Sequence, residues 1–199
     1  MPSPFSKLAL MLSPAVALAC TGLTPSSASA AQPLLCRPFV DFSNADEMRR
    51  WRVVNDGVMG GRSSGQIRLD DGTMIYTGSI NTNGGGFSSI RRTISPGTLA
   101  NAVALKFNHA GDGRVYKVSI RSSAAYRRRP ISFQAPIPSG KQGAMVALDD
   151  LQGSFRGYQT PGARFDREQA FEIGIILADG IDGPFEMSMG SIEICENPV

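Results

Sequence analysis

The residues of this chain that could do chemistry gather in two short segments, but they do not form a complete catalytic set. The first, Trp51 to Gly65, reads WRVVNDGVMGGRSSG, and the second, Asn81 to Arg92, reads NTNGGGFSSIRR. Such glycine-rich segments can present backbone N–H groups to an anion. Neither has the Gly-Lys-Ser/Thr or strand-to-helix pattern of a nucleotide-binding loop. The sequence therefore favours glycines that serve tight connections and close backbone approach.

Asp56 is the most informative acid in these segments, because Asn55-Asp56-Gly57 is a turn sequence. In such turns a carboxylate binds backbone N–H groups, and the alternative is contact with a ligand. No spacing in the chain nominates a pair of carboxylates for hydrolysis of a glycosidic bond. We expect a structural role for Asp56, and we keep Asn55 and Asp56 as candidates for ligand or partner contact.

The remaining inventory predicts a protein that is not an enzyme and that has no metal and no cofactor. His109 is the only histidine among the 199 residues, which excludes metal sites built on two histidines. No Gly-x-Ser-x-Gly nucleophile sequence accompanies it. Cys36 and Cys195 could not act as nucleophiles if they were bonded to each other, because the free thiolate is the reactive form.

A carbohydrate site would need an aromatic side chain beside polar groups. Trp51 is the only tryptophan and is as well suited to a core as to a binding platform. Tyr76, Tyr126 and Tyr158 are alternatives, and the last two stand in loop-like contexts. The candidates for ligand or partner contact are Trp51, Asn55, Asp56, Tyr126 and Tyr158.

The first thirty residues resemble an export signal that is cleaved. Lys7 is followed by an apolar run from Leu8 to Leu23 and by the small residues Ala28-Ser29-Ala30. The run is too short for a membrane span of ~20 residues, and we expect a periplasmic or secreted protein. The alternative is a lipoprotein anchored through Cys20, which we favour less because Ala17 stands where such signals usually have Leu.

The mature chain, residues 31–199, is long enough for one domain with a hydrophobic core. It has 19 Lys and Arg residues against 17 Asp and Glu residues, a net charge of +2, which gives no case for nucleic acid. Arg127-Arg128-Arg129, before Pro130, is better explained as a solvated loop end than as a phosphate-binding patch.

Cys36 and Cys195 lie at the two ends of the mature chain and are predicted to form a disulfide, in keeping with export. The bond would join the first strand to the last. Closure of so long a loop stabilises a fold by roughly 4 to 5 kcal/mol in the chain-entropy model, less any native strain. Two unpaired buried thiols are the alternative.

Apolar residues recur with a period of two along most of the mature chain, which predicts strands with one buried face. Turn sequences such as Asp70-Asp71-Gly72 separate the strands, so a β-sandwich or barrel is expected. In the last strand the apolar parity changes at Gly190, which predicts a β-bulge. Only two helical turns are expected, one at Ala45 to Trp51 with Asn44 as its cap and one after Asp166. The clearest alternations are Val103, Leu105 and Phe107; Tyr116, Val118 and Ile120; and Phe171, Ile173, Ile175 and Leu177.

Residues Trp51 to Ser63 resemble the opening signature of the complex I intermediate-associated protein family, the NADH:ubiquinone oxidoreductase intermediate-associated domain. Asn83 to Arg91 is similar to its second motif, and the resemblance extends from about Phe39 to Ile194. It implies an all-β, galactose-binding-like jelly-roll sandwich in a single domain. The best-known members are factors that help to assemble respiratory complex I without being catalytic subunits.

Two functions from different classes are therefore expected. The resemblance implies a non-enzymatic interaction or assembly module that binds a protein partner, here in the periplasm or outside the cell. The alternative is a module that binds carbohydrate or another small ligand in loops at one end of the jelly roll, by analogy with other domains of that fold.

Overall fold

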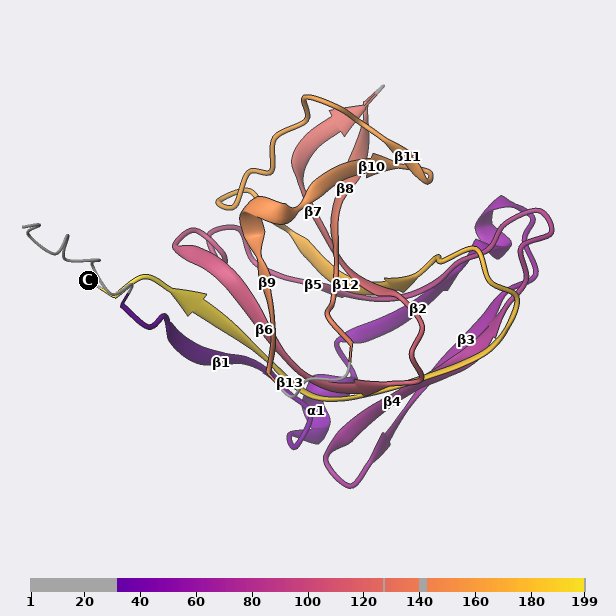
Figure 1. Cartoon of the computed structure of the whole chain (residues 1–199), viewed down its shortest axis with the longest axis horizontal. Helices are drawn as coiled ribbons and strands as arrows, with labels where there is room; N and C mark the ends of the chain where they lie inside the picture. Colours follow the sequence, from indigo (N-terminus) through magenta and orange to yellow (C-terminus); the bar gives the residue numbers. More distant parts are fainter. Residues whose placement is uncertain (1–31, 127, 140–142, 199) are drawn as a thin grey trace, which may run out of the picture. The chain divides into compact units, whose positions relative to one another are not determined.

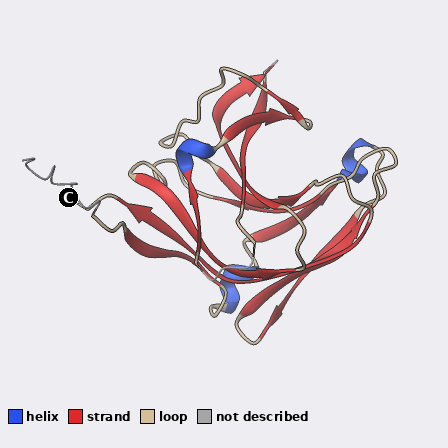
Figure 2. Ribbon diagram, viewed as in Figure 1, coloured by secondary structure: helices blue, strands red, loops and turns tan. Residues whose placement is uncertain are grey.

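The structure, a computed structural model, describes residues 32–126, 128–139 and 143–198, all within one compact unit, Gln32–Val199. The predicted signal peptide at 1–30 and the alternative lipid anchor at Cys20 lie outside the described residues. Strands and their connections make up nearly all of this unit (Figure 2).

The first of two antiparallel sheets places the last strand of the chain at its centre. Strand β13 (Gly183–Glu196) pairs with β4 from Gly183 to Met189 and with β6 from Met187 to Glu196. Strand β1 also pairs with β13, near the end of the chain. The strand order is β3 (Ser64–Asp70), β4 (Thr73–Ile80), β13, β6 (Ala102–Gly111) and β9 (Ala144–Ala147), with β1 (Leu35–Asp41) off this path.

The second sheet has seven strands and is curved. In Figure 1, strands β10 and β11 turn away from the plane of β2 and β5 at the far end of this sheet. The two sheets pack face to face, so the all-β jelly-roll sandwich predicted from the sequence is confirmed. The strand order is β11 (Tyr158–Gln159), β10 (Gln152–Phe155), β8 (Arg129–Pro136), β7 (Tyr116–Tyr126), β12 (Glu172–Leu177), β5 (Ser88–Thr93) and β2 (Trp51–Asn55).

The predicted alternation sorts side chains between the core and the outer face of the second sheet. In β7, Tyr116, Val118 and Ile120 are buried, and so are Ile173, Ile175 and Leu177 in β12. Because successive side chains of a strand point to opposite faces, the residues between them face outward. The outer face of β7 consequently carries Lys117, Ser119 and Arg121.

Strand β13 contains the predicted bulge. Its pairing with β6 shifts between Met189 and Ser191, and the carbonyl oxygen of Gly190 accepts a hydrogen bond from the backbone N–H of Phe42 at 3.0 Å. Because of the extra residue, odd-numbered residues face the core before the bulge and even-numbered residues face it after the bulge. Met187, Met189 and Ile192 are therefore all buried.

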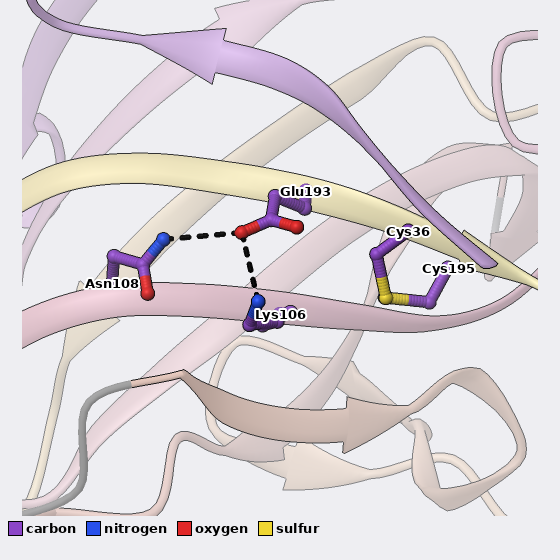
Figure 3. Close-up of a disulfide and its surroundings, with 5 residues drawn as sticks. All are labelled: Cys36, Lys106, Asn108, Glu193 and Cys195. Atoms are coloured by element: carbon purple, nitrogen blue, oxygen red, sulfur yellow. Dashed lines mark hydrogen bonds and ion pairs between the residues drawn. A yellow bond between two sulfur atoms is a disulfide. The ribbon is translucent and has the colours of Figure 1, made fainter. Parts of the chain in front are cut away.

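The predicted disulfide is present between the first and last strands. Cys36 and Cys195 are direct partners in the pairing of β1 with β13, and their sulfur atoms are 2.00 Å apart. On the neighbouring stretch of β13, Glu193 accepts a hydrogen bond from Asn108 at 3.2 Å and pairs with Lys106 at 3.1 Å (Figure 3). The disulfide between Cys36 and Cys195 closes a loop with a sequence separation of 159 residues.

The helical segments are short, and one prediction about them is wrong. Helix α1 (Ala45–Met48) forms where expected, and the Asn44 side chain caps it by accepting the N–H of Asp46 at 3.0 Å. No helix follows Asp166. Its carboxylate accepts the N–H groups of Glu168 and Gln169, as a helix cap would, but the chain makes a single turn and then joins the sheet, where the Phe171 N–H donates to the Arg121 carbonyl at 2.9 Å. Two 3-10 segments, η1 (Asp56–Met59) and η2 (Leu148–Asp150), complete the described elements.

Candidate binding groove

The two glycine-rich segments meet at the buried carboxylate of Asp56. This side chain is fully buried and accepts the backbone N–H of Ser63 at 2.9 Å and the Ser63 hydroxyl at 2.6 Å. From the second segment it accepts the N–H groups of Gly86 at 2.6 Å and Phe87 at 3.3 Å. We call Asp56, Ser63, Gly86 and Phe87 the Asp56 cluster. It ties the loop after η1 to the loop before β5.

The electrostatics of the cluster favour an ionised carboxylate. Burial by itself raises the pKa of Asp56, but the hydrogen bonds from Ser63, Gly86 and Phe87 together outweigh it, and the net pKa lies below the ordinary value. Gly61 and Gly85 lie against the same carboxylate, and a Cβ atom at either position would overlap it. The glycines there permit the close approach that the four hydrogen bonds require.

Trp51 and Asn55, two of the other candidates for ligand contact, make internal hydrogen bonds. Trp51 is 6% exposed, and its indole N–H donates to Glu47 Oε1 at 3.0 Å, where Arg92 also pairs at 2.8 Å. The side-chain oxygen of Asn55 accepts the Ser88 hydroxyl at 2.6 Å. The side chains of Trp51 and Asn55 therefore help to hold strands β2 and β5 in place through internal hydrogen bonds.

Tyr126 and Tyr158 lie at the opposite end of the second sheet. They are 44% and 80% exposed. The Tyr126 ring lies 5.3 Å from the ring of Phe155, and Tyr158 is the direct strand partner of Phe155. Phe155 borders the groove described next, so these two tyrosines lie beside that groove, although neither lines it. The five candidates are thus spread over two regions of the molecule.

The outer face of the seven-stranded sheet holds a groove with a volume of about 1060 Å³. We call this hollow the groove. Loop residues Met59, Gly85, Gly86 and Phe87 border it near the Asp56 cluster, and residues of β8 and β10 line its far part. The side chains that line it from the strands include Val54, Arg91, Lys117, Arg121, Ser132, Gln134, Pro136, Gln152, Ser154 and Ile176.

The strand register arranges the floor of the groove in rows. Directly paired residues follow one another across six strands, and their side chains share a face because paired residues of antiparallel strands point to the same side. This central row spans about 24 Å, from five interstrand spacings of ~4.8 Å. It is formed by Arg52, Arg91, Gly174, Ser119, Gln134 and Gln152. Of these residues, Arg91, Gln134 and Gln152 line the groove.

One carboxylate, Glu172, lies under the basic side chains of the floor. It pairs with Arg52, with Arg91 at 3.7 Å and with Arg121 at 3.4 Å. Its side chain is 8% exposed, whereas that of Arg121 is 30% exposed. Arg91 and Arg121 consequently line the groove, while the carboxylate stays beneath them.

Sequence reasoning did not nominate these groove residues. The alternation of Lys117 and Arg121 with buried neighbours was a signal that both face outward, but it did not identify the strands beside them. Arg129, assigned from the sequence to a solvated loop end, lines the groove. Within the described part of the chain, no group of three or more His, Cys, Asp or Glu residues is arranged to hold a metal ion.

A family comparison matches most of this structure. The model of complex I intermediate-associated protein 30 (CIA30) matches residues 40–189. The chain belongs to the CIA30 family. The match includes the Asp56 cluster and all the strands that form the floor of the groove, from β2 to β12. No curated protein matches the chain in sequence.

Solved structures with the same fold are carbohydrate-binding modules and part of an agarase. A family 11 carbohydrate-binding module from Clostridium thermocellum, in complex with a β-1,3-1,4-mixed-linked tetrasaccharide, has a TM-score of 0.59 and 15% identity, with 83% of this chain and 96% of that chain covered. The family 11 module of the cellulosomal cellulase Lic26A-Cel5E from the same organism has a TM-score of 0.60, 15% identity and coverages of 83% and 95%. An agarase has a TM-score of 0.53 and 12% identity, with 82% of this CIA30-family chain and 25% of the agarase chain covered. At these identities the likeness shows the fold alone. In the described part of the chain, no helix is both long and apolar enough to cross a membrane.

Proposed function

We propose that this CIA30-family protein is a non-catalytic binding module that holds an extended glycan in the groove. The observation that carries the proposal is the part of the floor formed by β7, β8 and β10, where directly paired side chains of successive strands line the groove at intervals of ~4.8 Å. These are Arg121, Ser132 and Ser154 in one row and Gln134 and Gln152 in the next. This interval is comparable with the length of one sugar ring. A glycan lying across the strands would therefore meet a new side chain at about every sugar.

The chemistry of these rows suits sugar hydroxyls. Amide groups such as those of Gln134 and Gln152 donate and accept hydrogen bonds, and the hydroxyl of Ser132, which also lines the groove, does the same. Pockets that bind small ligands combine apolar contacts with a few such polar groups, and Val54 and Ile176 supply apolar contacts here. The carbohydrate-binding modules of the same fold add support, because the name of each states carbohydrate binding.

The lining gives little basis for hydrolysis. Glycosidases use two carboxyl groups on either side of the scissile bond. Among the described residues that line the groove, Asp150 is the only acid. Glu172 lies beneath the floor and is engaged by three arginines. The proposal therefore assigns the groove to binding. Export to an oxidising compartment is part of the proposal and is supported by the disulfide.

The test is a panel of soluble glycans against the mature protein, with thermal shift as the first readout and calorimetry for any ligand that raises Tm. Replacement of Gln134 and Gln152 by Ala should lower affinity by roughly 10- to 100-fold, the equivalent of two lost hydrogen bonds. The matched control is Gln66→Ala on β3 of the other sheet, which should bind like the wild type. A panel without any stabilising glycan, or equal loss in the control, would refute the proposal.

A protein partner is the second candidate, because the name of the family describes association with a complex I intermediate. The two candidates predict different results in one experiment. Recovery of one stoichiometric protein by affinity purification from the cell envelope, combined with a silent glycan panel, would favour the partner.

A further inference from the structure

The basic side chains of the groove outnumber the acidic ones. Five cationic side chains line it, those of Arg91, Lys117, Arg121, Arg129 and Arg156, against the single carboxylate of Asp150. The chain as a whole has a net charge of only +3. The positive charge is therefore concentrated on one face of the second sheet and is not a general property of the surface.

Three guanidinium groups share one carboxylate on the floor of this groove. Arg52, Arg91 and Arg121 all pair with Glu172, which leaves two positive charges in excess at this point. The crowding is visible in Arg91, whose pKa is lowered first by burial and then by the neighbouring charge of Arg121. An anion placed above Glu172 would relieve this repulsion.

Two further cations face the groove without an acidic partner. In the described ranges 32–126, 128–139 and 143–198, neither Lys117 nor Arg129 takes part in an ion pair. Lys117 is half-buried on β7, two positions before Ser119 of the central row. Its ammonium group and the guanidinium of Arg121 lie on one strand face, on either side of that row.

Aromatic side chains are scarce where a neutral glycan would need them. The apolar faces of sugar rings, like nucleic acid bases, pack on aromatic rings. Among the described residues that line the groove, the aromatic ones are Phe87, in the loop before β5, and Phe155, at the end of β10. The central row contains none. Charge and hydrogen bonding must therefore supply most of the affinity.

We propose that the groove binds an acidic polysaccharide, with Arg91, Lys117 and Arg121 as anchors for its carboxylate or sulfate groups. This inference rests on the proposed glycan-binding function and names the class of glycan. Guanidinium groups bind such oxyanions through two parallel hydrogen bonds. Gln134 and Gln152 line the same groove and take the uncharged hydroxyls.

The test compares four probes by calorimetry: polygalacturonate, dextran sulfate, a neutral mixed-linked β-glucan and a single-stranded oligonucleotide. We expect an acidic glycan to bind, the neutral glucan to bind far more weakly, and the affinity for the acidic glycan to fall as salt rises, because screening weakens exposed charge pairs. Stronger binding of polygalacturonate would identify carboxylate as the recognised group, and stronger binding of dextran sulfate would identify sulfate.

The key variant is Lys117→Gln, because Lys117 has no ion pair among the described residues and its loss leaves Glu172 satisfied. It should weaken acidic-glycan binding roughly tenfold, the range of one charge-assisted hydrogen bond. Arg121→Gln should do the same, and urea unfolding of both variants establishes that they are folded. The control is Arg68→Gln on β3, an exposed cation of the other sheet, which should bind like the wild type.

The outcomes separate this inference from the proposed function. Equal binding of neutral and acidic glycans, with no effect of Lys117→Gln, would overturn the anionic class and leave the glycan groove standing. Preference for the oligonucleotide, or equal loss in Arg68→Gln, would also overturn it. A complete absence of glycan binding would overturn both proposals.

Discussion

Replacement of Asp56 by Asn tests whether the Asp56 cluster acts as a clamp, that is, whether its hydrogen bonds hold the two glycine-rich segments together and stabilise the fold. The substitution keeps the size of the side chain, so it opens no cavity. It removes the charge and replaces one acceptor oxygen with an NH₂ group. Since the carboxylate accepts all four of its hydrogen bonds from N–H and O–H groups, one of these donors must then face the NH₂ group.

The magnitude follows from the two oxygens of Asp56. One of them, Oδ2, accepts the Ser63 hydroxyl, Gly86 N–H and Phe87 N–H, whereas Oδ1 accepts Ser63 N–H at 2.9 Å. The least costly arrangement puts the amide NH₂ at Oδ1 and leaves the N–H of Ser63 unpaired. A hydrogen bond to a charged group contributes ~1.5 to 3 kcal/mol, and an unpaired buried donor costs ~1 to 3 kcal/mol. We expect a loss of about 2 to 3 kcal/mol.

The assay is urea unfolding at pH 7 with thermal unfolding beside it. For a domain of this length, a loss of that size should lower Tm by roughly 5 to 10 °C. The matched control is Asp70→Asn, which changes an exposed carboxylate paired with Arg68 at the surface and should stay within ~0.5 kcal/mol of wild type. If Asp56→Asn is as stable as this control, the clamp does not hold the fold.

The same clamp predicts a pH dependence of known sign. The pKa of Asp56 is lowered in the folded protein. Its stabilising effect is therefore fully present above the unfolded-state pKa of ~3.9 and is lost as the pH falls through the lower folded-state pKa. The advantage of wild type over Asp56→Asn should narrow below about pH 4, because a protonated carboxyl resembles the amide. A constant difference down to pH 2 would contradict an ionised Asp56.

Two further predictions concern the frame of the sandwich. Arg114 donates to both oxygens of Asp179, at 2.9 and 2.6 Å, and to the backbone carbonyls of Ile181, Gly183 and Pro184. Because lysine lacks the planar guanidinium group, Arg114→Lys should lower the free energy of unfolding by about 1 to 3 kcal/mol. The control is Arg68→Lys, which should leave the stability unchanged. Equal stability of the two variants would show that the fork adds nothing. Replacement of Cys36 and Cys195 by Ser should remove up to ~5 kcal/mol under oxidising conditions, given the 159-residue separation. Quantitative alkylation of both cysteines in the unreduced wild-type protein would contradict the disulfide.

The sequence predicted the fold well because its strands have one buried face. Alternation identified which side chains of β7 and β12 reach the core, and the parity change at Gly190 located the bulge of β13. The expected helical turn after Asp166 did not form, although its side chain makes the contacts of a helix cap, because the Phe171 N–H pairs with the Arg121 carbonyl of β7 after a single turn. Propensity alone does not distinguish a capped helix from a closed turn.

The candidate site was harder to predict, because its residues come from strands far apart in sequence. Arg91, Lys117 and Gln152 come to line one groove only through the order β10, β8, β7, β12, β5, and no local pattern encodes that order. Sequence reasoning instead favoured Trp51 and Asp56, which are unusual residues in a dense motif. Both are buried, since a motif with many specific contacts is as readily produced by packing as by binding.

The groove and the signature are nevertheless connected. Gly86 and Phe87 donate to Asp56 and also border the groove, so the carboxylate positions one wall of the groove without touching a ligand there. The four hydrogen bonds of Asp56 come from Ser63, Gly86 and Phe87, whereas residues of β8 and β10 line the far part of the groove. In the proposed function, the signature therefore positions one wall of the groove, whereas the outward residues Arg91 of β5 and Lys117 and Arg121 of β7 select the charge of the ligand.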